Sequence, residues 1–141
     1  MKREEIVAAA YRFVELKTRW QRMGRSDTRL DCYGLLIRVR ESFGLPSEDY
    51  QRYGLYPQDA IAMDTMKRMF TQVHPPLKPG QVVVFSFDGR PWHMGITSID
   101  RYGRLSVIHC SALHKHTIEE PFEGELKNHF RAAFEFPGVE D

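Results

Sequence analysis

The segment DCYGLLIRVRESFG, residues 31–44, decides the fold, because it joins a helix start, an apolar helix face and a helix stop. Asp31 stands directly before the apolar run and carries the short acceptor side chain preferred at a helix N-cap. Cys32, Val39 and Phe43 share one face at helical spacing, and Gly44 provides the expected stop. The segment therefore predicts a core-packed helix with the Cys32 thiol in its first turn.

Two further helices are predicted, one on each side of this segment. Apolar residues recur at helical spacing from Arg3 to about Trp20, which predicts an amphipathic helix. Residues 24–28 are polar and predict a loop, and residues 46–57 mix aromatic and polar types without a period, which predicts a long surface loop of the kind that shapes a binding cleft. Residues 58–73 predict the third helix, which Pro75-Pro76 ends.

After Gly80 the sequence changes to short runs rich in β-branched and aromatic residues, which predict strands. Turn sequences at 88–91 and 100–103 predict hairpins between them. Because the predicted helices precede the strands, we expect one α+β domain over residues 1–141, with N-terminal helices packed on a C-terminal antiparallel sheet. The predicted strands are 81–87, 92–99, 104–110 and 130–136.

Composition excludes several classes of protein. The 20 Lys and Arg against 19 Asp and Glu give a net charge of +1, so nothing indicates a nucleic acid or an anionic membrane as partner. The apolar run at residues 6–10 is too short for a signal peptide or a membrane span, so we expect neither. The 2 cysteines cannot form a disulfide framework, and we expect both thiols to be free.

The pattern around Cys32 indicates nucleophilic chemistry. A helix N-terminus lowers the pKa of a thiol, which favours the reactive thiolate, and an imidazole is then needed as its partner and base. The predicted hairpin at 100–103 folds strand 92–99 back along strand 104–110 and so brings His93 close to His109. We therefore predict that Cys32 and the two neighbouring imidazoles form one reactive group, in which an imidazole pairs with the thiolate and a second polar group orients it.

Four motifs occur in an order that resembles a known family. They are DCYGL at 31–35, KPGQVVVF at 78–85, HMGI at 93–96 and VIHCS at 107–111. Together they resemble the NlpC-type cell-wall peptidases, a papain-like family, over roughly residues 20–121. The resemblance implies a papain-like fold without a cofactor, Cys32 as nucleophile, His93 as base and His109 as the orienting group. It also implies hydrolysis of peptide-stem amides of peptidoglycan, typically between D-glutamate and diaminopimelate or lysine.

The same resemblance implies four substrate-binding residues. Trp20 occupies the position where the family often has a tyrosine, and keeps an aromatic wall and one N–H donor but no phenol. Asp31 matches an aspartate that in some members binds the free amine of the stem peptide, in addition to its expected N-cap role. Tyr33 follows the nucleophile, where the family commonly has a small residue, and Trp92 precedes the base.

A subgroup of the family is also resembled. Residues 31–46, with the tyrosine-rich segment after them, are similar to the small single-domain relatives encoded with phage tails and gene-transfer particles. This implies synthesis in the cytoplasm without an export signal, action on the cell wall as part of a particle, and phage tail proteins as partners.

Three alternatives compete with the predicted cell-wall peptidase. A papain-like amidase or acyltransferase would use the same thiol and imidazole, although the Cys-before-His order favours a peptidase. A catalytically weak structural tail-tip subunit would keep the fold alone. Cys32, His93, His109 and Cys110 are also suitable zinc ligands, but strand alternation places His109 and Cys110 on opposite faces and no CxxC or HxxxH spacing is present, so we expect no metal.

Overall fold

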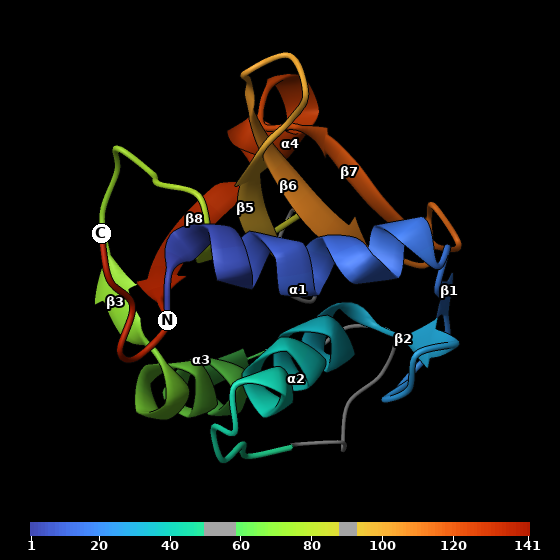
Figure 1. Ribbon diagram of the computed structural model, residues 1–141, viewed down its shortest axis with the longest axis horizontal. Helices are drawn as coiled ribbons and strands as arrows, with labels where there is room; N and C mark the ends of the chain where they lie inside the picture. The colour runs from blue at the N-terminus through green and yellow to red at the C-terminus, as the bar shows by residue number, and fades with distance from the viewer. Residues whose placement is uncertain (50–58, 88–92) are drawn as a thin grey trace.

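Two helices lie across one face of a six-stranded sheet in this computed structural model, which describes residues 1–49, 59–87 and 93–141 (Figure 1). They are α1 (Arg3–Glu15) and α2 (Cys32–Ser42). The other elements, in chain order, are β1 (Arg19–Trp20), β2 (Arg29–Leu30), α3 (Asp59–Met69), β3 (Thr71–Val73), β4 (Gln81–Phe85), β5 (His93–Ile99), β6 (Leu105–Cys110), β7 (Thr117–Pro121), α4 (Gly124–Asn128) and β8 (Phe130–Glu135).

The large sheet has the strand order β3-β8-β4-β5-β6-β7, and every neighbouring pair in it is antiparallel. A separate parallel pair joins β1 to β2 at its own edge of the molecule. The predicted α+β class, with N-terminal helices on a C-terminal antiparallel sheet, is confirmed. No helix in the described ranges combines the length and the apolar character needed to cross a bilayer.

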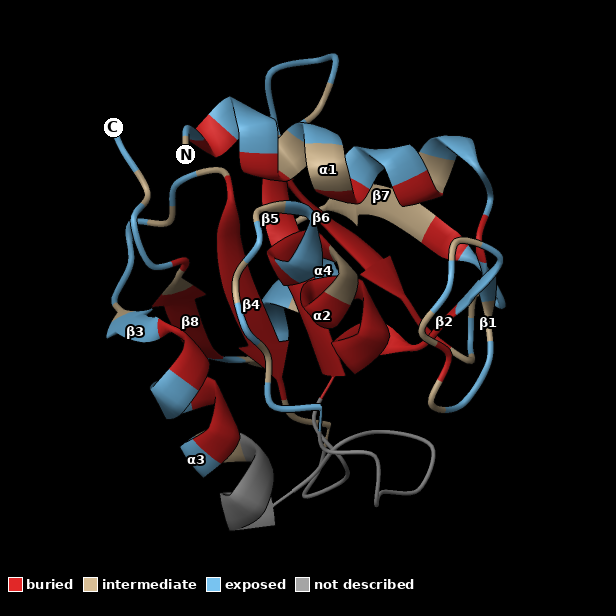
Figure 2. Cartoon of the chain, turned by 60° about the horizontal axis from the view of Figure 1, so that its bottom comes forward, coloured by how far each residue is buried: buried red, intermediate tan, exposed pale blue. Residues whose placement is uncertain are grey.

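The two faces of the sheet carry different cores. On the helical face, Met94 and Ile96 of β5 pack with Ile108 of β6 against α1 and α2 in the larger cluster. On the opposite face, Val83 and Val107 belong to a smaller cluster that α4 and the residues around it cover in part. Figure 2 shows the central strands as buried and the outward side of α1 as exposed. Successive residues of β5 therefore face different surroundings, as strand alternation requires.

Two predicted helices end earlier than their apolar spacing indicates. The first stops at Glu15, and residues 19–20 form β1, because the backbone N–H of Trp20 donates to the Lys115 carbonyl instead of continuing the helix (2.8 Å). The third stops at Met69, and residues 71–73 pair with β8 as β3. Tertiary strand pairing wins over helical periodicity in both places. The predicted turn at 88–91 and most of the predicted loop at 46–57 lie outside the described residues.

Candidate active site

Asp31 holds the start of α2, as its predicted N-cap role requires. Its Oδ1 accepts a hydrogen bond from the backbone N–H of Gly34 (2.7 Å), and its Oδ2 accepts one from the N–H of Met23 (2.8 Å). The Arg25 guanidinium adds an ion pair at 2.9 Å, and the Asp31 carboxylate is fully buried. These contacts build a rigid first turn for Cys32. The predicted contact of Asp31 with a substrate amine stays a prediction.

Gly34 allows the loop before α2 to lie against the first turn of the helix. A Cβ at this position would overlap the carbonyl oxygen of Gly24 and would lie 2.9 Å from Arg25 Nη1. Because a backbone atom cannot yield as a flexible side chain can, only glycine fits here. The nucleophile candidate is therefore enclosed by its own preceding loop.

The Cys32 thiol is buried, and its electrostatics differ from the sequence expectation. Burial raises its pKa well above the ordinary value of 9.0, the neighbouring Asp31 charge raises it further, and the backbone N–H groups of Met94 and Tyr33 lower it. The expected lowering of the pKa by the helix N-terminus is wrong for this conformation, because loss of hydration outweighs the helix dipole. Cys32 is a neutral thiol here, and both cysteines are free, as predicted.

The predicted approach of His93 and His109 is confirmed. His93 Nε2 lies 2.5 Å from His109 Nδ1, and the two rings meet edge to face with centroids 4.8 Å apart. Both residues are buried, and Phe85 stacks beside the His93 ring. Burial lowers the pKa of His93 well below its ordinary value of 6.5, and the neighbouring His109 and His114 lower it further. His93 is therefore a neutral imidazole.

The thiol packs with Met94 on the helical face of the sheet, whereas the histidine pair lies on the opposite face. The ladder between β5 and β6 runs from Ile96–Ile108 to Ile99–Leu105, so its register does not extend to His93. The backbone N–H of Met94, the residue after His93, contacts the Cys32 sulfur. Among the described residues no hydrogen bond joins Cys32 to the His93 ring itself.

Glu120 continues the histidine pair toward solvent, and the sequence analysis missed it. Its Oε1 lies 2.7 Å from His109 Nε2, and this hydrogen bond lowers the pKa of Glu120 below 4.5 although burial opposes the shift. Glu120 belongs to β7, which was not predicted. Once Thr117–Pro121 is paired with β6, Glu120 stands two residues from the register partner of His109, within reach of a long side chain.

The other predicted site residues have the following placements. Trp20 is half-buried in β1, and its indole Nε1 is buried without a hydrogen-bond partner within the part of the chain that the structure describes. Tyr33 is buried, and its hydroxyl donates to the Glu48 carbonyl. Trp92 lies outside the described residues. The substrate-binding roles of these three residues stay predictions.

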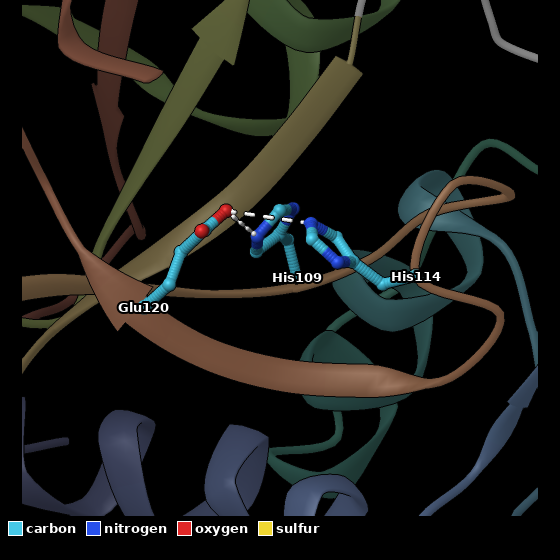
Figure 3. A group of neighbouring side chains, drawn as sticks. All are labelled: His109, His114 and Glu120. Atoms are coloured by element: carbon cyan, nitrogen blue, oxygen red, sulfur yellow. Dashed lines mark hydrogen bonds and ion pairs between the residues drawn. The ribbon is translucent and has the colours of Figure 1, made fainter. Parts of the chain in front are cut away.

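His114 joins the same polar group from the turn after β6. Figure 3 shows its ring converging with His109 on the Glu120 carboxylate. His114 Nε2 lies 3.7 Å from Glu120 Oε1, and its ring meets that of His109 edge to face at 5.5 Å. Burial lowers the pKa of His114, as does the neighbouring His109. Cys110, by contrast, faces the helical side, as strand alternation predicted.

Comparison with known proteins adds a fold relationship. No protein-family model and no curated protein matches the sequence. Among solved structures, a NlpC/P60 family protein from Bacillus cereus is similar with a TM-score of 0.70 and 16% sequence identity, over 95% of this chain and 40% of that protein. The chain thus spans about two fifths of that protein's length. At this identity the likeness establishes the fold, and it confirms the papain-like architecture predicted from the four motifs.

Proposed function

We propose that this chain is a cysteine peptidase of the cell wall, which hydrolyses amide bonds in the peptide stems of peptidoglycan. The observation that carries the proposal is the hydrogen-bonded series His93–His109–Glu120. Its inner end, His93, directly precedes Met94, whose backbone N–H contacts the Cys32 thiol. A nucleophile, a base and an orienting chain are the parts that acyl transfer by a thiol requires. The likeness to an NlpC/P60 fold supports the choice of substrate.

The Glu120 carboxylate determines which nitrogen of His93 acts as the base. A carboxylate only accepts hydrogen bonds, so His109 carries its proton on Nε2 and presents the lone pair of Nδ1 to His93. His93 must then donate from Nε2, which leaves the lone pair of its Nδ1 free of a proton. The proposed base is therefore His93 Nδ1.

The proposed reaction uses a neutral thiol in place of a preformed ion pair. His93 Nδ1 takes the Cys32 proton as the sulfur attacks the scissile carbonyl, and the resulting imidazolium gives that proton to the departing amine. Water, deprotonated by the same nitrogen, then cleaves the thioester and restores the thiol. Among the described residues the indole N–H of Trp20 has no hydrogen-bond partner, which supports its proposed role as a donor to the substrate.

Digestion of purified peptidoglycan tests this function directly. The intact chain should release muropeptide fragments that mass spectrometry identifies, and Cys32→Ala should abolish the release. Cys110→Ala is the matched control, because Cys110 is an equally buried free thiol whose side chain faces the helices. The proposal fails if Cys32→Ala still releases fragments, or if Cys110→Ala alone loses them while remaining folded.

The finer substrate and setting are proposed from the motifs of residues 31–46. We infer cleavage between D-glutamate and diaminopimelate or lysine, by a peptidase carried on a phage tail or gene-transfer particle. Defined muropeptides of known stem composition separate the candidate bonds, since each predicts a different fragment mass. Cleavage at another stem bond would overturn the inferred specificity and leave the peptidase proposal intact.

The burial of Cys32 favours one second candidate, a structural subunit that has kept the fold and lost the activity. Such a subunit would sediment with peptidoglycan sacculi without releasing fragments, and Cys32→Ala would not change the sedimentation. An amidase or acyltransferase would instead act on amidated or acylated small substrates and leave muropeptides intact.

A further inference from the structure

We propose that His109, His114 and Glu120 form a Zn²⁺ site on the face of the sheet opposite the helices. Each residue offers one ligand atom, and these atoms all lie within 4.8 Å of one another. Imidazole nitrogen and carboxylate oxygen are ordinary zinc ligands, and two histidines with one carboxylate leave the fourth tetrahedral position for water. The set differs from the Cys-containing one that the sequence argued against, because it uses neither thiol.

Two of the three distances between ligand atoms suit a tetrahedral ion after small movements, and the third, between the two histidine nitrogens, must shorten further, from at most 4.8 Å. Ligand atoms about 2.0–2.1 Å from zinc lie about 3.3 Å apart at the tetrahedral angle. Glu120 Oε1 lies 3.7 Å from His114 Nε2 and 2.7 Å from His109 Nε2, so one distance shortens and the other lengthens by about half an ångström. Figure 3 shows both histidine rings directed at the Glu120 carboxylate.

The turn between β6 and β7 holds His114 in place. The backbone N–H of His114 donates to Ser111 Oγ (3.2 Å), and that of Lys115 donates to the Ser111 carbonyl (2.9 Å). Lys115 has a φ of 68°, in the left-handed region, and its carbonyl accepts from the N–H of Trp20. The turn is therefore fixed from within and from β1, so the backbone that carries His114 is held in place.

The surroundings of the three ligands also suit a metal ion. The second nitrogen of His109 is held by His93, as the outer nitrogen of a metal-bound histidine usually is. His109 is buried, whereas the side chains of His114 and Glu120 are each 34% exposed, which provides a route from solvent. Two neutral imidazoles and one carboxylate would leave a bound Zn²⁺ with a net charge of +1.

Zinc at this site would reverse the hydrogen bonds that define the base, an effect that rests on the proposed function. Zinc takes the lone pair of His109 Nε2, so the proton of that ring must sit on Nδ1 and be donated to His93 Nε2. The proton of His93 then moves to its Nδ1. Both rings stay neutral and no proton is lost, but His93 Nδ1 can no longer accept the Cys32 proton. Zinc is therefore expected to inhibit.

Zinc binding itself is measured without any reaction, by competition between the metal-free full chain and a chromophoric chelator for Zn²⁺ alone. We expect one ion per chain, and about 100-fold or greater weakening in His114→Ala, since even an outer-shell change can cost a site that much. His116→Ala is the matched control in the same turn, and its affinity should not change. Cys32→Ser should also bind as the parent chain does, which distinguishes this site from the thiol.

Each contrary outcome overturns the site. Equal affinity in His114→Ala would show an adventitious ion only, and loss of binding in Cys32→Ser would assign the ion to the thiol. If fragments are released from peptidoglycan, His114→Ala should lose the inhibition by Zn²⁺, measured as the ratio of its own rates with and without the ion. If none are released, the proposed function fails while the binding result still decides the metal site.

Discussion

The two faces of the sheet beneath β5 and β6 hold their polar groups in different ways. On the helical face, the Asp31 carboxylate is fully buried and committed to two N–H groups and a guanidinium, and the Cys32 thiol beside it is neutral. On the other face, hydrogen bonds lead from buried His93 through His109 to half-exposed Glu120. One face fixes the thiol that we propose as nucleophile, and the other holds a series of hydrogen bonds that leads from the interior toward solvent.

The largest expected effect is on activity, and His93→Gln should produce it on the face that holds the histidines. Glutamine can keep a hydrogen bond to His109 but cannot accept a proton as a base. We therefore expect kcat for the release of fragments from peptidoglycan to fall about 10³-fold. The melting temperature should change little. An active His93→Gln chain would show that the base lies elsewhere.

Asp31→Asn should lower the stability of the helical face. Asparagine keeps an acceptor for the Gly34 N–H but removes the buried one of the two carboxylates that pair with Arg25, the other being Asp49, and we expect a loss of about 3 kcal/mol in the free energy of unfolding by urea. Asp27→Asn is the control, since Asp27 pairs with Arg12 and Arg38 in an exposed setting and should cost less than about 1 kcal/mol. Equal costs would contradict the assignment.

Gly95→Ala should disturb the packing of β5 against β6, the two strands that both faces share. A Cβ there would lie 2.5 Å from Val107 Cγ1 and 2.8 Å from the Ile108 carbonyl oxygen, so β5 and β6 must separate beside the histidine pair. We expect about 2 kcal/mol of lost stability in urea denaturation, typical of overpacking, together with a fall in activity. Unchanged stability would mean that the strands have room to adjust.

Glu120→Gln should sharpen the account of the proton route. The amide oxygen can still accept from His109 Nε2, but the charge that favours this tautomer is lost, so we expect kcat to fall about tenfold, or about 1.4 kcal/mol. Glu119→Gln is the neighbouring control, because its carboxylate binds Ser98 and has no contact with the histidines among the described residues. A larger effect at Glu119 would refute the tautomer argument.

The pH dependence of stability should show the smallest effect. Burial keeps His93 neutral, whereas the unfolded chain takes up a proton below about pH 6.5. Neutral His93 thus makes its full contribution to stability above this pH. Below it, the free energy of unfolding should fall by up to about 1.4 kcal/mol for each pH unit. His93→Gln should flatten this slope between about pH 6.5 and 5, and His116→Gln, at an exposed position, should not.

The sequence predicted the features that depend on residues close together in the chain. The Asp31 cap, the helix after it and the pairing of His93 with His109 all follow from neighbouring residues or from one hairpin. Glu120 escaped prediction because Thr117–Pro121 lacks a clear apolar alternation and becomes a strand only by pairing with β6. The raised pKa of the Cys32 thiol could not be predicted either, since the loss of hydration depends on how closely the preceding loop and the sheet pack around the sulfur.

The enclosure of Cys32 has a consequence for the durability of the protein. Peroxide oxidises thiolates much more readily than thiols, and exposure governs which cysteines progress to sulfenic and then irreversible sulfinic acid. A neutral, buried sulfur is shielded on both counts. The burial that keeps the Cys32 thiol neutral would therefore preserve it through long storage in air, until His93 takes its proton in the proposed reaction.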